Sequence, residues 1–275
     1  MMKNILNLGN PIRKSIINPL ETWNSNVMGT ISILESVRSI KNNCVVTFIT
    51  SDKVYKNQEW VWGYRETDRL GGKDPYSASK GMAELAIRSY TESFFNTSDS
   101  HITLGVARAG NVIGGGDWAK DRIVPDCMSA WSKGDIVEIR NPNATRPWQH
   151  VLEPLSGYLK LAEQLEKNGD QYAEAWNFGP AEIDARPVQW IIEKMAKLWG
   201  ENANWINDKS EHPHEANYLK LDCSKAHMKL NWYPRWDLSE TLLRIVEWHK
   251  LKDAHNNYRK LCLTQINDYM GGINK

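Results

Sequence analysis

The chain has 275 residues, a formal net charge of +1, and hydrophobic residues at 41% of its positions. A chain of this length can bury one large core or two smaller ones. Its balanced charge gives no electrostatic reason to expect nucleic acid as a partner, and no run approaches the ~18 consecutive apolar residues of a membrane span.

The amino terminus and the cysteines indicate a cytoplasmic protein. The first twenty residues mix Lys3, Arg13 and Lys14 with Asn, Gly and Pro, so they lack the continuous apolar stretch of a secretory signal. The four cysteines include no Cys-x-x-Cys pair, which is typical of buried thiols in a reducing compartment. His212 and His214 flank a proline and have no further ligands nearby in sequence, so we expect no metal site.

Apolar periodicity predicts alternating helices and strands in the first part of the chain. This alternation, with short connections, is typical of a parallel sheet. Residues 54–75 lack periodicity and are rich in Trp, Gly and charge, which predicts an ordered loop over a site. In chain order we expect a strand stump at 5–9, a helix over 18–39, a strand over 45–50, a helix from Tyr76 to about 95 and a strand over 102–107.

After Asn111 the pattern becomes less regular. A glycine-rich loop spans 114–118, but it is not a phosphate-binding P-loop because no Lys-Ser/Thr follows it. The expected elements after it are a helix over 123–133, an exposed strand over 136–139, a polar loop over 141–148, a helix over 152–167, a short buried strand over 175–180 and helices over 187–199 and 238–252.

The candidate chemistry begins where the strand over 45–50 ends. Open α/β sheets present their functional groups at this carboxyl edge, and here the strand runs into Ser51, Asp52 and Lys53. Tyr76 and Lys80 are four residues apart, so on a helix the ammonium can lie beside the phenol and favour its ionised form. Such a phenolate can remove the proton of an alcohol while hydride leaves the carbon. A plain strand-end turn with an Asp cap and a solvated helix face are the alternatives that the residues alone leave open.

Six segments carry motifs that occur together in one order: 26–30, 50–53, 60–66, 76–80, 108–118 and 146–151. On the basis of these motifs, the chain resembles the extended short-chain dehydrogenase/reductases that act on nucleotide sugars. It resembles the CDP-glucose 4,6-dehydratases most closely. The resemblance runs from about residue 16 to the end. A lone Tyr-x-x-x-Lys arises often by chance, whereas its combination with Ser-Asp-Lys and Gly-Gly-Gly-Asp-Trp is specific.

This resemblance implies an α/β fold made of a partial Rossmann-type parallel sheet and a smaller mixed α/β substrate-binding domain. Residues 1–112 would be the remnant of the NAD-binding domain with the catalytic residues. Residues 113–275 would be mainly the nucleotide-sugar-binding domain, with 152–180 returning to the Rossmann sheet. The family begins with a strand, a Gly-x-x-Gly-x-x-Gly turn and a helix that holds the dinucleotide pyrophosphate. The early glycines here are Gly9 and Gly29, so we expect the first βα units to be missing.

The resemblance also implies the reaction, an NAD-dependent dehydration of a nucleotide sugar in deoxysugar biosynthesis of the kind that serves lipopolysaccharide O-antigen. The sugar would be oxidised at C4, would lose water across C5 and C6, and would be reduced at C6. Ser51, Tyr76 and Lys80 would carry out the oxidation, and Asp52 and Lys53 would act as acid and base in the elimination.

Further positions of the family's motifs imply binding roles. His150 is expected to be a packed residue and not a catalyst. Arg146 suits a diphosphate because its planar fork gives paired hydrogen bonds, although a surface ion pair is the alternative. The implied cofactor-binding residues are Asn26, Thr50, Tyr76, Lys80 and Ala109, and the implied substrate-binding residues are Asn111, Arg146, Glu215 and Tyr218.

Two other functions remain open at the level of the sequence. The chain could be a non-catalytic nucleotide-sugar-binding remnant, or a subunit that needs a complementing chain. It could also be another nucleotide-sugar epimerase or dehydratase, but an epimerase needs no acid–base pair, so Asp52 and Lys53 argue against that. The expected partners are a nucleotide-sugar substrate and either a second copy in a homodimer or a complementing amino-terminal fragment. We expect weak NAD binding, and low solubility from an exposed sheet edge.

Overall fold

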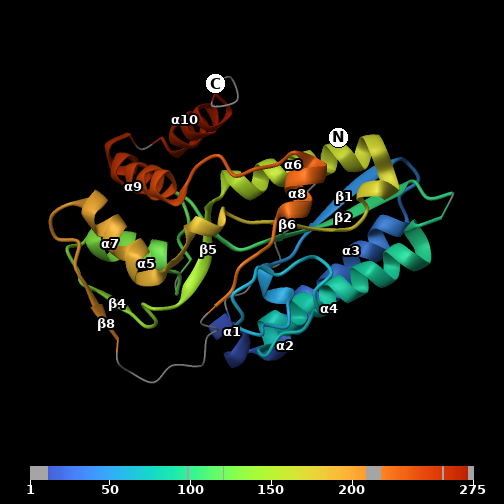
Figure 1. Cartoon of the computed structure of the whole chain (residues 1–275), viewed down its shortest axis with the longest axis horizontal. Coiled ribbons are helices and arrows are strands. Elements are labelled where there is room, and N and C mark those ends of the chain that lie inside the picture. The colour runs from blue at the N-terminus through green and yellow to red at the C-terminus, as the bar shows by residue number, and fades with distance from the viewer. Residues whose placement is uncertain (1–11, 98, 120, 209–217, 256, 272–275) are drawn as a thin grey trace. The chain divides into compact units, whose positions relative to one another are not determined.

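The computed structural model describes residues 12–97, 99–119, 121–208, 218–255 and 257–271, which form two compact units (Figure 1). The strand stump predicted at 5–9, the two histidines around Pro213 and Glu215 lie outside the described residues. Unit 1 comprises the described parts of Met1–Gly110, Leu155–Phe178 and Leu221–Tyr233. Unit 2 comprises those of Asn111–Pro154, Gly179–Lys220 and Pro234–Lys275.

Unit 1 is built on a parallel sheet, as expected. Its strands are β1 (Cys44–Ile49), β2 (Ile102–Ala109) and β6 (Ala175–Phe178), in the order β1-β2-β6. Leu34, Phe48, Ile87 and Leu104 belong to one core cluster, which joins helices α3 (Gly29–Arg38) and α4 (Pro75–Tyr90) to the sheet. On β2, Gly105 faces α6 (Leu152–Asn168) so closely that an added Cβ would lie 2.9 Å from a methyl group of Leu165.

The two long helices predicted in the first hundred residues are present but interrupted. The first consists of α2 (Pro19–Trp23), a π-helical turn at Asn24–Met28 and α3. The second consists of α4 and a π-helical turn at Thr91–Phe95. Unit 1 also contains α1 (Ile12–Ile17) and α8 (Ser224–Leu230), which the sequence pattern did not predict.

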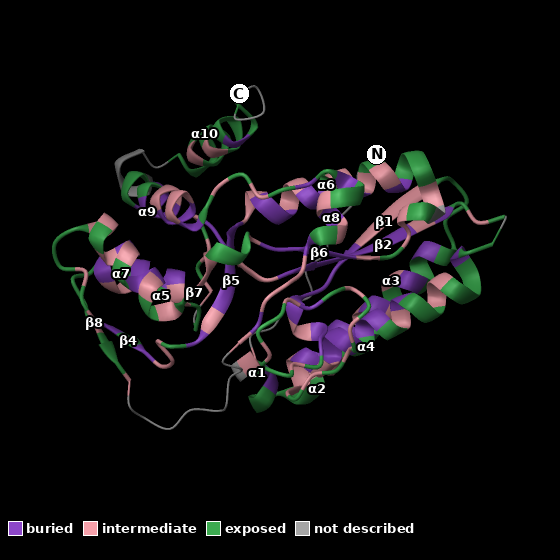
Figure 2. Cartoon of the chain, in the orientation of Figure 1, coloured by how far each residue is buried: buried purple, intermediate pink, exposed green. Residues whose placement is uncertain are grey.

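Unit 2 contains two small sheets and the helices that pack on them. Figure 2 shows β5 almost wholly buried, and residues of α5, α7 and α9 share one core cluster with Trp148 of β5. One sheet joins β3 (Asn111–Ile113), β5 (Thr145–His150) and β7 (Ala185–Pro187), and the other joins β4 (Val137–Ile139) and β8 (Trp205–Asn207). The helices are α5 (Ile123–Trp131), α7 (Val188–Trp199), α9 (Leu238–His255) and α10 (Tyr258–Gly271).

The prediction of a polar loop over 141–148 is wrong for the second half of that range, because β5 begins at Thr145. Its residues Arg146, Gln149 and His150 are polar yet buried, so the strand lacks the apolar alternation by which strands are recognised. The strands β7 and β8 were missed because their three residues each, Ala-Arg-Pro and Trp-Ile-Asn, do not alternate between apolar and polar. The strand predicted over 136–139 is β4, and only its middle residue, Glu138, is exposed.

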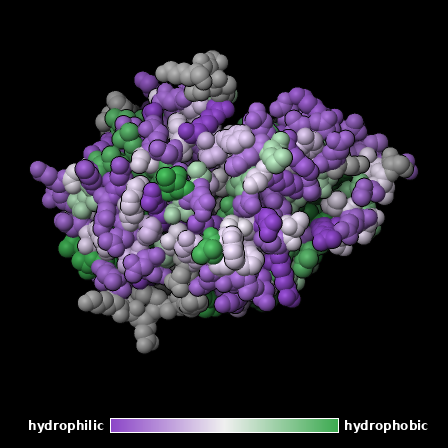
Figure 3. Space-filling model, viewed as in Figure 1, coloured by the Kyte–Doolittle hydropathy of each residue, from purple (hydrophilic) through white to green (hydrophobic). Residues whose placement is uncertain are grey.

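The surface is mixed in character. On the face shown in Figure 3, hydrophobic residues form small separate groups among hydrophilic ones. Among the described residues, no helix is both long and apolar enough to cross a membrane.

The contact between α6 and β6 gives a test of packing in unit 1. A Cβ on Gly157 would overlap the ring of Phe178, which is fully buried against Tyr158 and Trp232. We expect Gly157→Ala to lower the free energy of unfolding by about 1–3 kcal/mol, because a rigid aromatic ring must move. Chemical denaturation measures this.

The matched control is another helical glycine, Gly81 in α4, where an added Cβ would make an ordinary 3.5 Å contact with the carbonyl oxygen of Val54. Gly81→Ala should leave stability unchanged or raise it by about 0.5–1 kcal/mol through helix propensity. Equal effects of the two substitutions would contradict the tight α6–β6 packing.

Candidate active site

The polar triplet after β1 forms a tight turn. Ser51 is the N-cap of a 3₁₀ turn over Asp52–Val54, and its Oγ accepts a hydrogen bond of 3.2 Å from the backbone N–H of Lys53. The same hydroxyl donates to Oδ1 of Asp52 at 3.0 Å. Ser51 and Asp52 are buried, whereas Lys53 is half-buried. The capping residue is therefore the serine and not the aspartate, and the turn holds hydroxyl and carboxylate together at the strand end.

Helix α4 begins next to its predicted site residue. Pro75 occupies the first turn and Asp74 is the N-cap, with its carboxylate accepting from the Ser77 N–H at 2.9 Å. Proline and aspartate are suited to these positions, since the first turn leaves its N–H groups unpaired. The helix therefore starts at Pro75, and Tyr76 is fixed in its first turn.

Lys80 lies on the same helix face as Tyr76. Its Nζ is 5.9 Å from the centroid of the Tyr76 ring, and the residue is only 2% exposed. Burial lowers the pKa of Lys80 from its ordinary 10.5 to about 8, and the nearby Glu84 carboxylate opposes this shift. A weakly solvated cation beside a phenol is the arrangement that favours the phenolate.

Asn26 approaches this helix from the π-helical turn at Asn24–Met28. Its Nδ2 donates to Oγ of Ser79 at 2.9 Å, directly beside Lys80 in sequence. Its Oδ1 is buried and has no hydrogen-bond partner among the described residues. Single π-helical turns occur frequently at functional sites.

The two other residues expected to bind the cofactor lie at strand ends. Thr50 follows β1 directly, and its hydroxyl donates to Oε1 of Glu84 at 2.5 Å, so the hydroxyl is engaged within the protein. Ala109 is the last residue of β2 and is buried. The Thr50 hydroxyl could still accept a hydrogen bond from a ligand, whereas Ala109 offers only its backbone groups.

The residues of unit 1 fit one end of NAD and not the other. The unpaired Oδ1 of Asn26 and the buried ammonium of Lys80, beside Tyr76, suit the nicotinamide ribose. The pyrophosphate needs a glycine-rich turn at a helix amino terminus, and these 275 residues contain no Gly-x-x-Gly-x-x-Gly.

Sequence reasoning missed a buried polar cluster behind these residues. Arg108 of β2 and Glu84 of α4 form a bidentate ion pair with both side chains only 4% exposed. Two signals could have found it. Glu84 follows Lys80 at helical spacing, and an arginine inside an apolar strand needs a buried partner.

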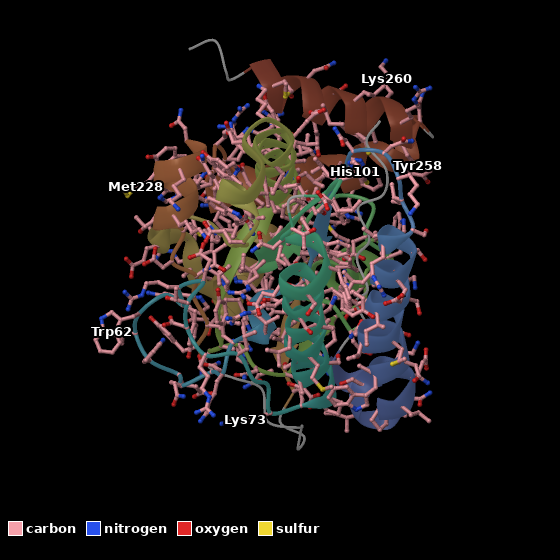
Figure 4. The ribbon with its side chains drawn as sticks, turned by 90° about the vertical axis from the view of Figure 1, so that its right-hand side faces the viewer. Trp62, Lys73, His101, Met228, Tyr258 and Lys260 are labelled. Atoms are coloured by element: carbon pink, nitrogen blue, oxygen red, sulfur yellow. The ribbon has the colours of Figure 1, made fainter. Side chains whose placement is uncertain are left out.

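A loop predicted to be ordered is held by aromatic stacking in the same unit. Tyr64 stacks on Tyr55 with ring centroids 5.1 Å apart, and Trp60 stacks on Tyr64 at 5.2 Å. Gly63 touches the backbone of Asp222, where a side chain would not fit. Trp62, at the end of this stack, is 68% exposed and points away from the ribbon in Figure 4.

Asn111, Arg146 and Tyr218, which are expected to bind substrate, belong to unit 2, and Glu215 lies outside the described residues. Arg146 is buried in β5, so the alternative of a surface ion pair is wrong. It lies opposite Arg186 of β7 in the antiparallel register. Asn111 is the first residue of β3, and Tyr218 is half-buried with Nζ of Lys220 5.2 Å from its ring centroid.

His150 is packed, as expected. It is 1% exposed, and burial together with the charge of Arg244 lowers its pKa to about 4. Among the described residues, no group of three His, Cys, Asp or Glu side chains could hold a metal ion.

Comparison with known protein sequences shows which family this chain resembles. The model of the GDP-mannose 4,6 dehydratase family matches residues 2–245. The chain is 52% identical to the CDP-glucose 4,6-dehydratase of Salmonella typhimurium over 267 residues, which cover 96% of this chain and 74% of the relative. It is 25% identical to a dTDP-glucose 4,6-dehydratase of Streptomyces antibioticus, over 87% of this chain and 67% of that protein.

Solved structures of lower identity share the fold. A UDP-glucose 4-epimerase of Thermotoga maritima with UDP-glucose matches with a TM-score of 0.77 and 20% identity, over 89% of this chain and 75% of the other. A UDP-glucuronic acid 4-epimerase of Bacillus cereus with UDP-glucuronic acid and NAD matches with a TM-score of 0.74 and 22% identity, over 88% and 72%.

The buried ammonium predicts a pH-dependent stability. The folded chain holds fewer protons than the unfolded one between about pH 8, the folded pKa of Lys80, and its ordinary 10.5. Stability therefore rises with pH across this window, and the whole cost of burying the charge is present below it. We expect Lys80→Met to be more stable than the parent chain below about pH 8, by up to about 3 kcal/mol, with the difference shrinking as the pH rises.

Urea denaturation of both proteins at several pH values measures this difference. If it stays constant across the window, Lys80 ionises in the folded chain as it does in the unfolded one, and the burial argument is wrong.

Proposed function

Because the chain belongs to the GDP-mannose 4,6 dehydratase family, we propose that it is a lyase that uses NAD to convert CDP-glucose to CDP-4-keto-6-deoxyglucose. The observation that carries this proposal is the 52% identity to the Salmonella CDP-glucose 4,6-dehydratase over 96% of the chain. The preference for a cytidine nucleotide rests on that relative alone.

When bound, NAD would accept a hydride from C4 of the sugar and return it to C6. Tyr76 would remove the proton of the C4 hydroxyl, with the Lys80 ammonium at 5.9 Å from its ring favouring the phenolate. Lys80 and the buried Oδ1 of Asn26 would bind the nicotinamide ribose. Ser51, at the end of β1, would bridge the sugar hydroxyl and Tyr76.

The elimination needs an acid and a base. The C4 ketone acidifies the hydrogen on C5, which the neutral amine of Lys53 would remove. The carboxylic acid of Asp52 would give its proton to the leaving C6 hydroxyl, so that one water leaves per turnover. The burial of Asp52 and its hydrogen bond with Ser51 support this role, because they hold the carboxyl group at the end of β1. A positioned proton transfer contributes ~100- to 10,000-fold in rate.

In unit 2, the proposed contacts are with the nucleotide diphosphate and sugar. The buried position of Arg146 in β5 supports a diphosphate site, because the planar fork of an arginine matches a phosphate group through paired hydrogen bonds. Asn111 at the start of β3 would bind the sugar or its phosphate, and Glu215 and Tyr218 the nucleoside.

A second candidate is a subunit that needs a complementing amino-terminal fragment, and two observations favour it. The sequence has no glycine fingerprint, and β1 pairs on one side only, with β2, among the described residues. A homodimer is the other proposed assembly, and the exposed Met82 and Leu85 on α4 would suit it. An epimerase is less well supported, because Asp52 and Lys53 would then have no task.

The proposal is tested by incubating the purified chain with CDP-glucose and NAD, alone and together with an amino-terminal fragment that carries the fingerprint. Mass spectrometry would show loss of one water from the nucleotide sugar. Product from the chain alone supports an independent dehydratase, and product only with the fragment supports the subunit. No product in either case refutes a catalytic role.

Cofactor affinity gives a separate prediction. A polypeptide of these 275 residues should bind NAD much more weakly than a relative that carries the fingerprint. The reason is that its sequence contains no glycine-rich turn that would let a helix amino terminus bind the pyrophosphate. Isothermal titration calorimetry of both proteins under the same conditions measures this. Equal affinities would show that other groups hold the pyrophosphate.

The phenol gives the sharpest catalytic prediction. Tyr76→Phe should lower turnover by ~100- to 10,000-fold with little change in KM, because it removes the base and leaves the ring. The control is Tyr90→Phe on the same helix, whose hydroxyl donates to Glu35 at the surface and which should retain activity. If Tyr76→Phe retains full turnover, the phenol is not the base.

A further inference from the structure

Glu84 is a buried acidic residue that the proposed reaction does not use. Its side chain is 4% exposed and lies in α4, one turn beyond Lys80. A carboxylate is costly to bury unless it is paired and hydrogen-bonded. Its place in the fold therefore depends on the groups that it binds.

The carboxylate binds two groups at the ends of neighbouring strands. The Thr50 hydroxyl, directly after β1, donates to Oε1 at 2.5 Å. The Arg108 guanidinium, at the penultimate residue of β2, donates through Nε at 2.9 and 3.0 Å and also through an Nη. Burial opposes the charge on Arg108, but its bonds to Glu84 raise its pKa above the ordinary value. One side chain of α4 thus joins that helix to both strand ends.

The helix face that carries Glu84 also carries the proposed catalytic residues. Tyr76, Lys80 and Glu84 follow one another at four-residue spacing, so they lie in a row. A shift or rotation of α4 relative to the end of β1 would break the contact of Glu84 with Thr50, the neighbour of Ser51. The position of the phenol is thereby tied to the position of the carboxylate.

The network extends from Arg108 to the third strand of the sheet. Arg108 donates to the Tyr55 hydroxyl at 2.8 Å, and this hydroxyl donates to Oδ1 of Asn177 at 2.6 Å. Asn177 belongs to β6 and is fully buried. Because every link is buried and directional, the three strand ends and α4 are held in one arrangement.

We propose that Glu84 is a positioning residue of this active site, which sets α4 against the ends of β1 and β2 and so places Tyr76 and Lys80 for proton transfer. Its effect on turnover rests on the proposed function, whereas its effect on the surroundings of Lys80 does not. The two effects are therefore measured separately.

The kinetic test uses Glu84→Gln, which keeps the shape of the side chain and removes its charge. We expect kcat to fall by about 10- to 100-fold with KM nearly unchanged, because misplacement of the phenol affects the chemical step and not substrate binding. The control is Glu153→Gln in unit 2, another fully buried carboxylate, which accepts from the N–H groups of Arg235 and Trp236. It should cost stability and leave kcat unchanged. If the two variants have the same kcat, the proposal is wrong.

A readout without turnover uses the Lys80 amine itself. Brief acylation with acetic anhydride, followed by peptide mass spectrometry, reports how readily this amine reacts. In Glu84→Gln, Lys80 should react several-fold faster than in the parent chain, because it loses a nearby carboxylate that favours the ammonium, and α4 loses its charged contact with the end of β2. In Glu153→Gln its rate should be unchanged. An unchanged rate in Glu84→Gln overturns the proposal, even if the parent chain proves to have no dehydratase activity.

The double variant Glu84→Met/Arg108→Met separates positioning from stability. Replacing a buried ion pair with apolar residues is often neutral or stabilising, so this variant should fold as well as the parent chain. We expect its kcat to stay low and its Lys80 amine to stay reactive. Recovery of both to the parent values would show that the pair serves stability alone, and would overturn the proposal.

Discussion

The bidentate contact between Glu84 and Arg108 is the interaction on which the candidate catalytic face of unit 1 depends. Neither charge can be buried alone, since an isolated ion in the protein interior costs several kcal/mol, so each fixes the place of the other. Such a pair contributes little net stability compared with apolar residues of the same size. Its consequence is geometric, because it determines where α4 lies on the sheet and therefore where Tyr76 and Lys80 lie.

The same constraint explains why a lysine can be buried beside the phenol. An ammonium with 2% exposure loses most of its hydration, and its pKa falls to about 8 as a result. The carboxylate of Glu84, already neutralised by Arg108, still opposes that fall. The balance leaves Lys80 a cation at neutral pH with weak solvation, and such a cation acts on a neighbouring phenol more strongly than a hydrated one would.

The pattern of apolar residues was enough to predict the long helices and the strands of unit 1, which show clear periods, but not the short helices α1 and α8. The same pattern fails to predict strands whose buried residues are polar. β5 was predicted as a loop because Arg146, Gln149 and His150 occupy positions where a period would show apolar residues. The helix α10 was missed because its exposed Leu263 and Ile266 give no clear apolar face.

The candidate site likewise contains some residues that the sequence predicts and others that it does not. The spacing of residues and the motifs were enough to predict Ser51, Asp52, Tyr76 and Lys80 as site residues, because their residue types are informative by themselves. Glu84 and Arg108 were not predicted, because they are 24 positions apart and only the packing of α4 on β2 reveals that they meet. Thr50 was assigned to the cofactor from resemblance, and the structure shows in addition that its hydroxyl donates to Glu84. A residue's motif thus predicts its location more reliably than its hydrogen-bond partner.

The chemistry and the cofactor cradle are physically separate parts of this site. The contacts that place Tyr76 and Lys80 all lie within residues 26–109 and the end of β6, and none of them requires a glycine-rich turn. A glycine-rich fingerprint would therefore affect the free energy of binding the dinucleotide and not the order of the catalytic face. If the pyrophosphate were held by another chain, the phenol and ammonium would already be in place, because the buried network that positions them is complete within unit 1.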